Sequence, residues 1–346
     1  MNITDDYGYI AWASKTGATV VYYLNILVFG PGILLNIIQI LLFQMKKFNR
    51  TTMGFYFTIN SVINILIIGY LMIYDIPMSQ NIVIQLNSDW NCRIYLFLLR
   101  IFYQCSSWLN VAVTADRFLF VLFFNKFKFQ NNRKILLMIL FGILIVIVMV
   151  NTPNLLFYIV EVKSNSTQTS SRYCTAHPTV LLIRDIFAIS IRTIIPFILM
   201  FFMNIVLIMK VRESKMKFKQ SRNMNQEIRF SLTVIATTMI FLITYTPNVI
   251  WIALTNNFLN DQSIKQRQTY NAFLFLFEIT SSIGYFVNYG MNIFVHFAFN
   301  SVFRKEVLRL LAQYLGIWAV KIKPENTANS SNNYRSNKST NPLREK

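Results

Sequence analysis

The chain has 346 residues, of which 54% are hydrophobic and 14% are charged, whereas soluble domains carry about 25% charged residues. This composition excludes an ordinary water-soluble domain. The formal net charge of +19 would indicate a nucleic-acid partner in a soluble protein, but here the charges lie between long apolar runs. We therefore interpret the basic bias as membrane topology, with membrane lipids as surroundings and no nucleic-acid partner.

Seven apolar runs follow one another, and each is long enough to cross a bilayer, which takes about 20 residues. Lipid offers no partner to unpaired backbone groups, so we expect every run to be a helix. The predicted spans are 20–44, 53–75, 92–124, 135–160, 181–211, 229–255 and 270–299. Bundled membrane helices tolerate proline as a kink, and four runs contain one: Pro31, Pro153, Pro196 and Pro247.

The predicted fold is an all-α membrane protein with a seven-transmembrane helix bundle. No linker rich in glycine or serine interrupts the runs, so we predict a single membrane domain over 20–314. Residues 1–19 form the N-terminal segment. Residues 315–346 are rich in Asn, Ser and Lys, which is typical of a disordered tail.

Lysine and arginine are unevenly distributed between the two sides of the predicted spans. Twenty-four of the 33 lie on one side, including the run from Lys210 to Arg222, and seven lie on the side of the N-terminus. Only Arg100 and Arg192 lie well within a span. Cytoplasmic loops are enriched in basic residues, so we predict a multi-pass plasma-membrane protein with an extracellular N-terminus and a cytoplasmic tail.

Glycosylation sequons add little to this topology. Asn2 and Asn165 each begin an Asn-x-Ser/Thr pattern on the predicted outer side, which makes both candidate acceptors. Asn49 and Asn337 begin the same pattern on the inner side. The pattern alone therefore does not decide the orientation.

Two of the three cysteines are placed to form a bridge. Cys92 lies at the outer end of the third span and Cys174 in the second outer loop, where an oxidising compartment would favour a disulfide. Such a bridge would hold that loop over the mouth of the bundle. The alternative is two free thiols. Cys105 lies in the middle of a span, which is typical of packing.

A charge pair, Asp116-Arg117-Phe118, stands at the inner end of the third span. Charges at a membrane boundary are costly unless neighbours or water hold them, and they usually mark function. Neighbouring Asp and Arg side chains could form a pairing that breaks when the bundle opens. The alternative is a boundary arginine that extends to the lipid headgroups.

The series of spans over about residues 20–314 resembles the rhodopsin-like (class A) G-protein-coupled receptors. Short motifs recur in the order and spacing of that family. They are Gly32 with Asn36, Trp90 with Cys92, Cys174, Asp116-Arg117-Phe118 in place of Asp-Arg-Tyr, Pro196, Phe241 with Pro247, Asn288 with Asn292, and Phe303-Arg304.

The resemblance implies a cell-surface receptor that binds an extracellular ligand and activates a heterotrimeric G protein, and it implies neither an enzyme nor a cofactor. It implies a disulfide between Cys92 and Cys174. It also implies a short amphipathic helix over 301–314, with Phe303-Arg304 near its start. The residues that it assigns to the conformational switch and to G-protein coupling are Asp116, Arg117, Phe118, Phe241, Tyr245, Pro247, Asn292 and His296.

The chain departs from the family pattern at several positions. Asn64 stands where the family has a sodium-binding aspartate, so we do not expect an allosteric sodium site. Tyr245 replaces the sixth-span tryptophan. The seventh-span motif Asn-Pro-x-x-Tyr reads from Asn292 to His296 without its proline and tyrosine, and His296 either titrates or packs as a neutral ring.

The ligand is predicted from polar residues in the outer half of the bundle. Leu99 occupies the position of the aspartate that binds the ligand nitrogen in amine receptors, which argues against a biogenic amine. Phe286 occupies the position of the lysine that carries retinal in opsins, which argues against retinal. A widely spread polar set favours a peptide, with Asp75 and Glu278 pairing with its basic or amidated end. Alternatively, Arg100, Arg192 and the acidic residues pair with each other as structural ions. The candidate ligand residues are Asp75, Arg100, Gln104, Arg192, Asn248, Trp251 and Glu278.

With spans rich in Asn and Phe and a moderately long second outer loop, the chain most resembles invertebrate neuropeptide receptors of the FMRFamide-receptor-like group. The competing interpretations are a receptor for a non-peptide chemosensory ligand, a transporter or channel, and an enzyme. Transporters commonly have two related halves with broken helices, and channels have rings of charges or carbonyls. The sequence has neither pattern, and it has no metal-ligand spacing.

Overall fold

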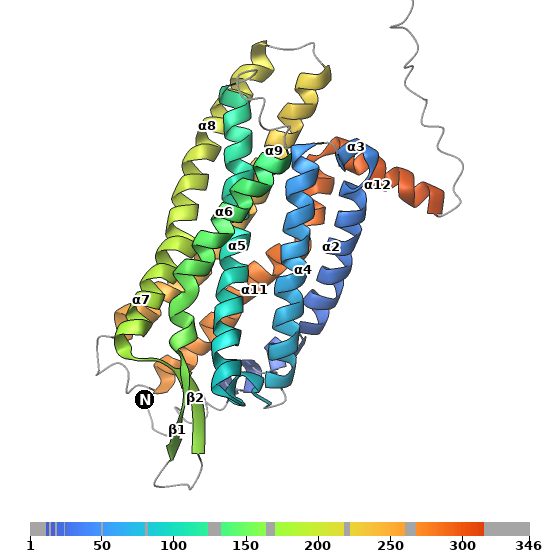
Figure 1. Cartoon of the computed structure of the whole chain (residues 1–346). Helices are drawn as coiled ribbons and strands as arrows, with labels where there is room; N and C mark the ends of the chain where they lie inside the picture. The colour runs from blue at the N-terminus through green and yellow to red at the C-terminus, as the bar shows by residue number, and fades with distance from the viewer. Residues whose placement is uncertain are drawn as a thin grey trace, which may run out of the picture. The chain divides into compact units, whose positions relative to one another are not determined.

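The computed structural model describes residues 12–13, 15–17, 19–23, 25–49, 51–79, 82–123, 133–163, 170–217, 222–259 and 268–314. The chain divides into two units, Met1–Arg304 and Lys305–Lys346, which are described separately. The first unit is a bundle of long helices with a small β hairpin at one end (Figure 1). The predicted domain limits stay a prediction, because both ends of the chain lie outside the described residues.

The first part of the bundle contains three long helical segments joined by short turns. A π-helical turn, η1, precedes Pro31 within the helical segment Lys15–Phe43, and both prolines and π-helical turns are common causes of helix kinks. The elements are η1 (Asn25–Phe29), α2 (Gly30–Phe43), α3 (Lys46–Asn49), α4 (Thr52–Ser79), η2 (Ile84–Leu86) and α5 (Asp89–Leu122).

The second part contains the hairpin and the remaining helices. Pro196 lies just after a second π-helical turn, η5, whereas Pro247 lies inside a long helix. The elements are α6 (Arg133–Asn151), η4 (Thr152–Leu156), β1 (Tyr158–Lys163), β2 (Ser170–Thr175), α7 (Pro178–Ile189), η5 (Ser190–Ile194), α8 (Ile195–Lys217), α9 (Arg222–Leu259), α11 (Gln268–Phe299) and α12 (Ser301–Tyr314).

Six helices among the described residues are long and apolar enough to cross a membrane: Lys15–Phe43, Thr52–Tyr74, Asp89–Leu122, Arg133–Leu156, Pro178–Lys210 and Arg229–Trp251. The seventh predicted span is α11, which has 32 residues but is interrupted by polar side chains such as Glu278 and Asn288. Large apolar side chains on the helices are exposed, as expected of surfaces that face lipid, and they include Leu41, Leu66, Phe141, Met149, Phe202 and Ile243.

One predicted boundary was wrong. The fourth span was predicted to continue to residue 160, but its helical part ends at Leu156, after Pro153 has removed a backbone donor. The residues from Tyr158 onward form β1, whose β-branched run favours a strand. The predicted inner ends of the fifth and sixth spans, at residues 211 and 229, agree with the apolar spans Pro178–Lys210 and Arg229–Trp251, and the helices themselves continue further, α8 to Lys217 and α9 from Arg222.

A large apolar and aromatic cluster lies in the interior of the first unit. Its members come from η1, α4, α5, α8, α9 and α11, so every one of these segments turns one face inward. This burial supplies the non-directional part of the packing. The buried members are Phe29, Ile67, Ile68, Leu71, Tyr103, Val111, Met200, Phe241, Leu242, Tyr245 and Tyr289.

Helices α2 and α11 approach each other closely through two glycines. A Cβ atom added to Gly290 would lie 3.3 Å from the Cα of Gly32. One turn along α2, Asn36 donates a hydrogen bond from Nδ2 to the carbonyl of Tyr289 at 2.9 Å. Small residues let membrane helices come near enough for such contacts, so Gly290 fixes the spacing of the first and seventh spans.

Gly290→Leu is therefore expected to destabilise the detergent-purified protein by about 1–3 kcal/mol, which overpacking typically costs. Thermal unfolding of the purified chain measures this. The matched control is Gly142→Leu, because a Cβ atom on Gly142 would meet nothing within 4 Å. Equal melting temperatures for the two variants would contradict the close approach.

Candidate functional site

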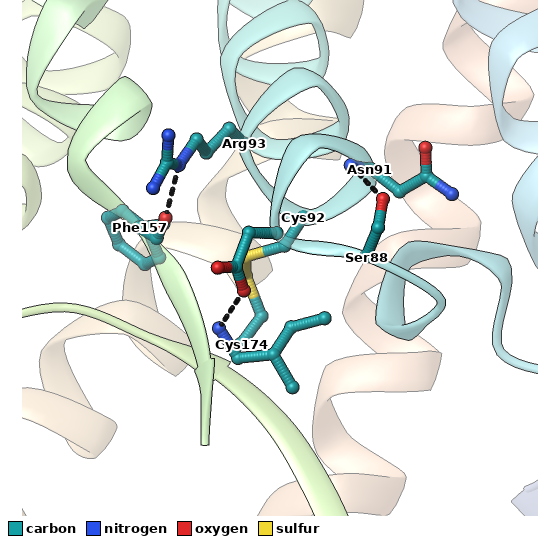
Figure 2. The surroundings of a disulfide bond; sticks show 8 residues. Ser88, Asn91, Cys92, Arg93, Phe157 and Cys174 are labelled. Carbon is teal, nitrogen blue, oxygen red and sulfur yellow. Dashed lines mark hydrogen bonds between the residues drawn. A yellow bond between two sulfur atoms is a disulfide. The ribbon is translucent and has the colours of Figure 1, made fainter. Parts of the chain in front are cut away.

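At the hairpin end of the bundle, a disulfide joins Cys92 at the start of α5 to Cys174 on β2, with a Cα–Cα distance of 5.9 Å (Figure 2). The predicted bridge is therefore confirmed. Strand β1 pairs antiparallel with β2, so that Ile159 lies opposite Cys174. Cys92 is fully buried against Phe157 and Ala176, which places the bridge in a small apolar core of its own.

Polar contacts add to the bridge and fasten the hairpin to α5. Arg93 donates from Nε to the carbonyl of Phe157 at 2.7 Å (Figure 2), and the backbone N–H of Ile159 donates to Asp89 Oδ1 at 2.8 Å. Ser88 caps α5 by accepting a hydrogen bond from the backbone of Asn91 at 3.2 Å. The hairpin is thus attached to α5 both by a covalent bond and by hydrogen bonds.

In the middle of the bundle, Arg192 from η5 lies buried among tyrosines. Its guanidinium carbon is 4.2 Å from the ring centroid of Tyr103 and 5.7 Å from that of Tyr245. The hydroxyls of Tyr245 and Tyr289 are 2.9 Å apart, and Phe241 stacks on Tyr245 at 4.4 Å. Desolvated cation–π contacts are worth about 2 kcal/mol, so Arg192 joins the third, fifth and sixth spans.

Hydrogen bonds between helices surround this centre. Asn151 of α6 donates to Gln104 Oε1 at 2.6 Å, and Trp108 donates from Nε1 to the carbonyl of Ile191 at 2.9 Å. Asn204 of α8 donates to Thr238 of α9 at 2.7 Å. Each of these bonds joins two different spans.

The predicted ligand residues fall into two groups. Arg100 is half-buried on α5 and interacts electrostatically with Arg192, and Gln104 is buried one turn further along α5. Asn248 is buried and Trp251 is half-buried, both on α9. Of the remaining two, Glu278 is exposed on α11, and Asp75 lies in α4 with its side chain outside the described part.

A seam of amides follows α2, α4 and α11. Asn64 donates from Nδ2 to Asn36 Oδ1 at 3.3 Å, and it is buried. The Oδ1 atoms of Asn64 and Asn288 are buried without a hydrogen-bond partner among the described residues. These neutral amides do not fit a cation, because they supply no negative charge, and no metal-binding group of His, Cys, Asp or Glu occurs in the described part of the chain.

At the opposite end of the bundle, Arg117 and Asp116 form a buried ion pair. The Nη2–Oδ2 distance is 2.7 Å, and each side chain is 4% exposed. Arg117 also donates to Thr52 Oγ1 at the start of α4, at 2.6 Å. Thr52 was not predicted, and it extends the pair from the third span to the second. Phe118 follows on α5 and is half-buried.

His296 is packed as an aromatic ring. It is fully buried, with ring centroids 4.1 Å from Phe57, 5.2 Å from Phe43 and 5.6 Å from Phe303. Neither ring nitrogen has a hydrogen-bond partner among the described residues. The enclosure favours a packed ring over a histidine that titrates in contact with water. Asn292 lies one turn before it on α11 and is also buried.

Some predicted features lie outside the description. Asn2 and Asn165, the candidate glycosylation sites, belong to segments that are not described, and so does the loop between α5 and α6.

The predicted amphipathic helix 301–314 corresponds to α12.

Long apolar helices with an interior of paired polar groups define a multi-pass α-helical membrane protein. A model of the 7 transmembrane receptor (rhodopsin family) matches residues 35–288, and the chain belongs to this family. It is therefore a receptor of the G-protein-coupled class and not an enzyme. No curated protein matches the sequence significantly.

Cys174→Ser is expected to lower the free energy of unfolding by about 2–5 kcal/mol, which is typical of losing a native disulfide, and so to reduce delivery to the cell surface. Surface antibody staining of a tagged receptor and thermal unfolding measure the two effects. Cys105→Ser is the control, because Cys105 is the free cysteine and is only half-buried. Unchanged surface staining and stability in Cys174→Ser would contradict a structural role.

The amide seam predicts that sodium has no effect on stability. At constant ionic strength, exchanging choline chloride for sodium chloride should leave the melting temperature of the purified receptor unchanged. Asn64→Asp should introduce a sodium-dependent increase, because the carboxylate adds the missing negative charge beside Asn36. A sodium effect in the unmodified chain would overturn this account of the seam.

Proposed function

We propose that this receptor binds an extracellular peptide and activates a heterotrimeric G protein. In this proposal the N-terminus and the hairpin face the outside, and the end that carries Arg117 faces the cytoplasm. The disulfide supports the orientation, because disulfides persist in oxidising compartments. The concentration of Lys and Arg from Lys210 to Arg222 supports it independently.

The observation that carries the proposal is the buried pairing of Arg117 with Asp116 and Thr52. Two charges in a poorly hydrated place are costly, and they are seldom kept for stability alone. The pairing holds the inner ends of α4 and α5 together. Separation of Arg117 from these partners would open this end for a G protein, so the pairing provides the two states that a switch needs.

Transmission from the outer half runs through Tyr245. This side chain contacts Arg192 of the fifth span, Tyr289 of the seventh and Phe241 of its own helix. Two residues later, Pro247 interrupts the backbone hydrogen bonding of α9, and proline is a common site of helix kinks. A ligand that moves Tyr245 would therefore act on the helix segment that swings about Pro247.

The peptide class is supported by the spread of polar side chains over several helices. Arg100 and Gln104 lie on α5, Arg192 on η5 and Asn248 on α9, so a ligand with several polar groups can be bound from different sides. Asp75 and Glu278 are proposed to receive its basic or amidated end. A screen of a neuropeptide library, read out by nucleotide exchange on the G protein, tests the ligand class directly.

Arg117→Ala is expected to reduce nucleotide exchange at least tenfold while surface expression is retained, because the group released on activation is missing. Exchange in membranes of cells that express equal receptor amounts measures this, both basally and with peptides that the screen identifies. Arg133→Ala is the matched control, since Arg133 is exposed and donates a hydrogen bond to Asn49 Oδ1 at 2.9 Å. Full exchange by Arg117→Ala would remove the proposed switch.

A further inference from the structure

We infer that the ligand carries a carboxylate that binds the arginine cluster formed by Arg100, Arg184 and Arg192. The inference deepens the proposed function and rests on it, because it assumes that the ligand reaches the bundle from the hairpin end. It names the chemistry of the ligand group that enters deepest. This group is acidic, in contrast to the basic or amidated end assigned to Asp75 and Glu278.

The cluster brings positive charges together within the membrane region. Arg192 and Arg184 oppose the positive charge of Arg100, and Asp185 favours it. Asp185 is itself bonded to Arg184, with an Nη2–Oδ1 distance of 2.7 Å. Like charges repel strongly where the dielectric constant is low. The cluster would therefore be stabilised by a further negative charge, which a ligand can bring.

The cluster also leads from the surface to the interior. Arg184 and Asp185 lie on α7 with side chains 19% and 28% exposed, Arg100 is half-buried, and Arg192 is 6% exposed. Arg184 also stacks over Phe157, at 5.1 Å from the ring centroid, directly before the hairpin. A ligand arriving beside the hairpin would meet Arg184 first and Arg192 last.

A second, independent observation indicates that a polar ligand group completes this region. Gln104 is 1% exposed, and its Nε2 has no hydrogen-bond partner among the described residues, although its Oε1 accepts from Asn151. The hydroxyl of Thr193, next to Arg192, is likewise buried without a described partner. Both are donors. Buried donors are normally satisfied, and a carboxylate accepts several hydrogen bonds at once.

Arginine suits this role better than lysine would. The guanidinium group offers parallel donors that match the two oxygens of a carboxylate, and it can stack on aromatic rings at the same time. Arg192 already lies over Tyr103 and Tyr245. A carboxylate bound to Arg192 would therefore act directly on Tyr245, which is where the proposed signal enters α9.

The experiment uses the full-length receptor in detergent and two small probes, 3-phenylpropanoate and its neutral amide, 3-phenylpropanamide. Thermal unfolding is recorded at constant ionic strength with increasing probe concentration. A ligand that binds only the folded state raises the melting temperature. The carboxylate should raise it by a few degrees at saturation and the amide should not, because the two probes differ only in the charged group.

Arg100→Gln and Arg192→Gln should each abolish the carboxylate shift. Arg172→Gln should retain it, since Arg172 is exposed on β2 in an ion pair with Glu161 at 3.6 Å. Without probe, Arg100→Gln should stay folded, because it removes the opposition of Arg192 and Arg184 together with the attraction of Asp185; this variant keeps the test usable if Arg192→Gln does not fold. Equal shifts with the two probes, or a carboxylate shift that persists in Arg100→Gln, would overturn the inference.

The readout is binding alone, so it separates this inference from the proposed function. A carboxylate shift without nucleotide exchange by any screened peptide would support the arginine cluster and count against G-protein coupling. Exchange stimulated by amidated peptides, together with no carboxylate shift, would support the receptor function and overturn the acidic ligand group.

Discussion

Lipid provides no hydrogen-bond partner, and this constraint accounts for where the polar side chains of the chain lie. The spans expose leucine, isoleucine and phenylalanine, and their amides and hydroxyls turn inward and bond from helix to helix. Asn36 bonds the backbone of α11, Asn151 bonds Gln104, and Asn204 bonds Thr238. Hydrophobic burial distinguishes little between one helix pairing and another in a membrane, so these directional contacts and the Gly32–Gly290 approach specify the arrangement.

The same interior links the two ends of the bundle. The disulfide and Asp89 fix the hairpin on α5, and α5 then carries Tyr103 beside Arg192 and ends with Arg117 bonded to Thr52. One helix, α5, thus contacts the hairpin at one end of the bundle, the aromatic centre, and carries the charge pair at the opposite end. A change of contacts around Arg192 acts on the helices that pack against α5, which is how a local electrostatic event can have a distant effect.

The sequence predicted the spans, the fold class and the disulfide, because length, hydropathy and cysteine position are properties of single segments. It did not predict Thr52, Asn151 or the tyrosine cluster, since these depend on which helix faces which. The spacing of three or four residues along the third span could have indicated its inward face: Tyr103, Ser107, Asn110, Thr114 and Arg117. The prediction for the fourth span wrongly included the first residues of β1, because its β-branched residues are apolar enough to resemble the continuation of a membrane span.

The orientation is the central claim, and cysteine labelling of intact cells tests it most directly. Ser166→Cys, between β1 and β2, and Ser214→Cys, in the basic part of α8, are each made on a Cys105→Ala background. A membrane-impermeant maleimide should label Ser166→Cys on intact cells, and Ser214→Cys only after permeabilisation. Labelling of Ser214→Cys from the medium, with Ser166→Cys protected, would place the Arg117 end outside and contradict the receptor mechanism.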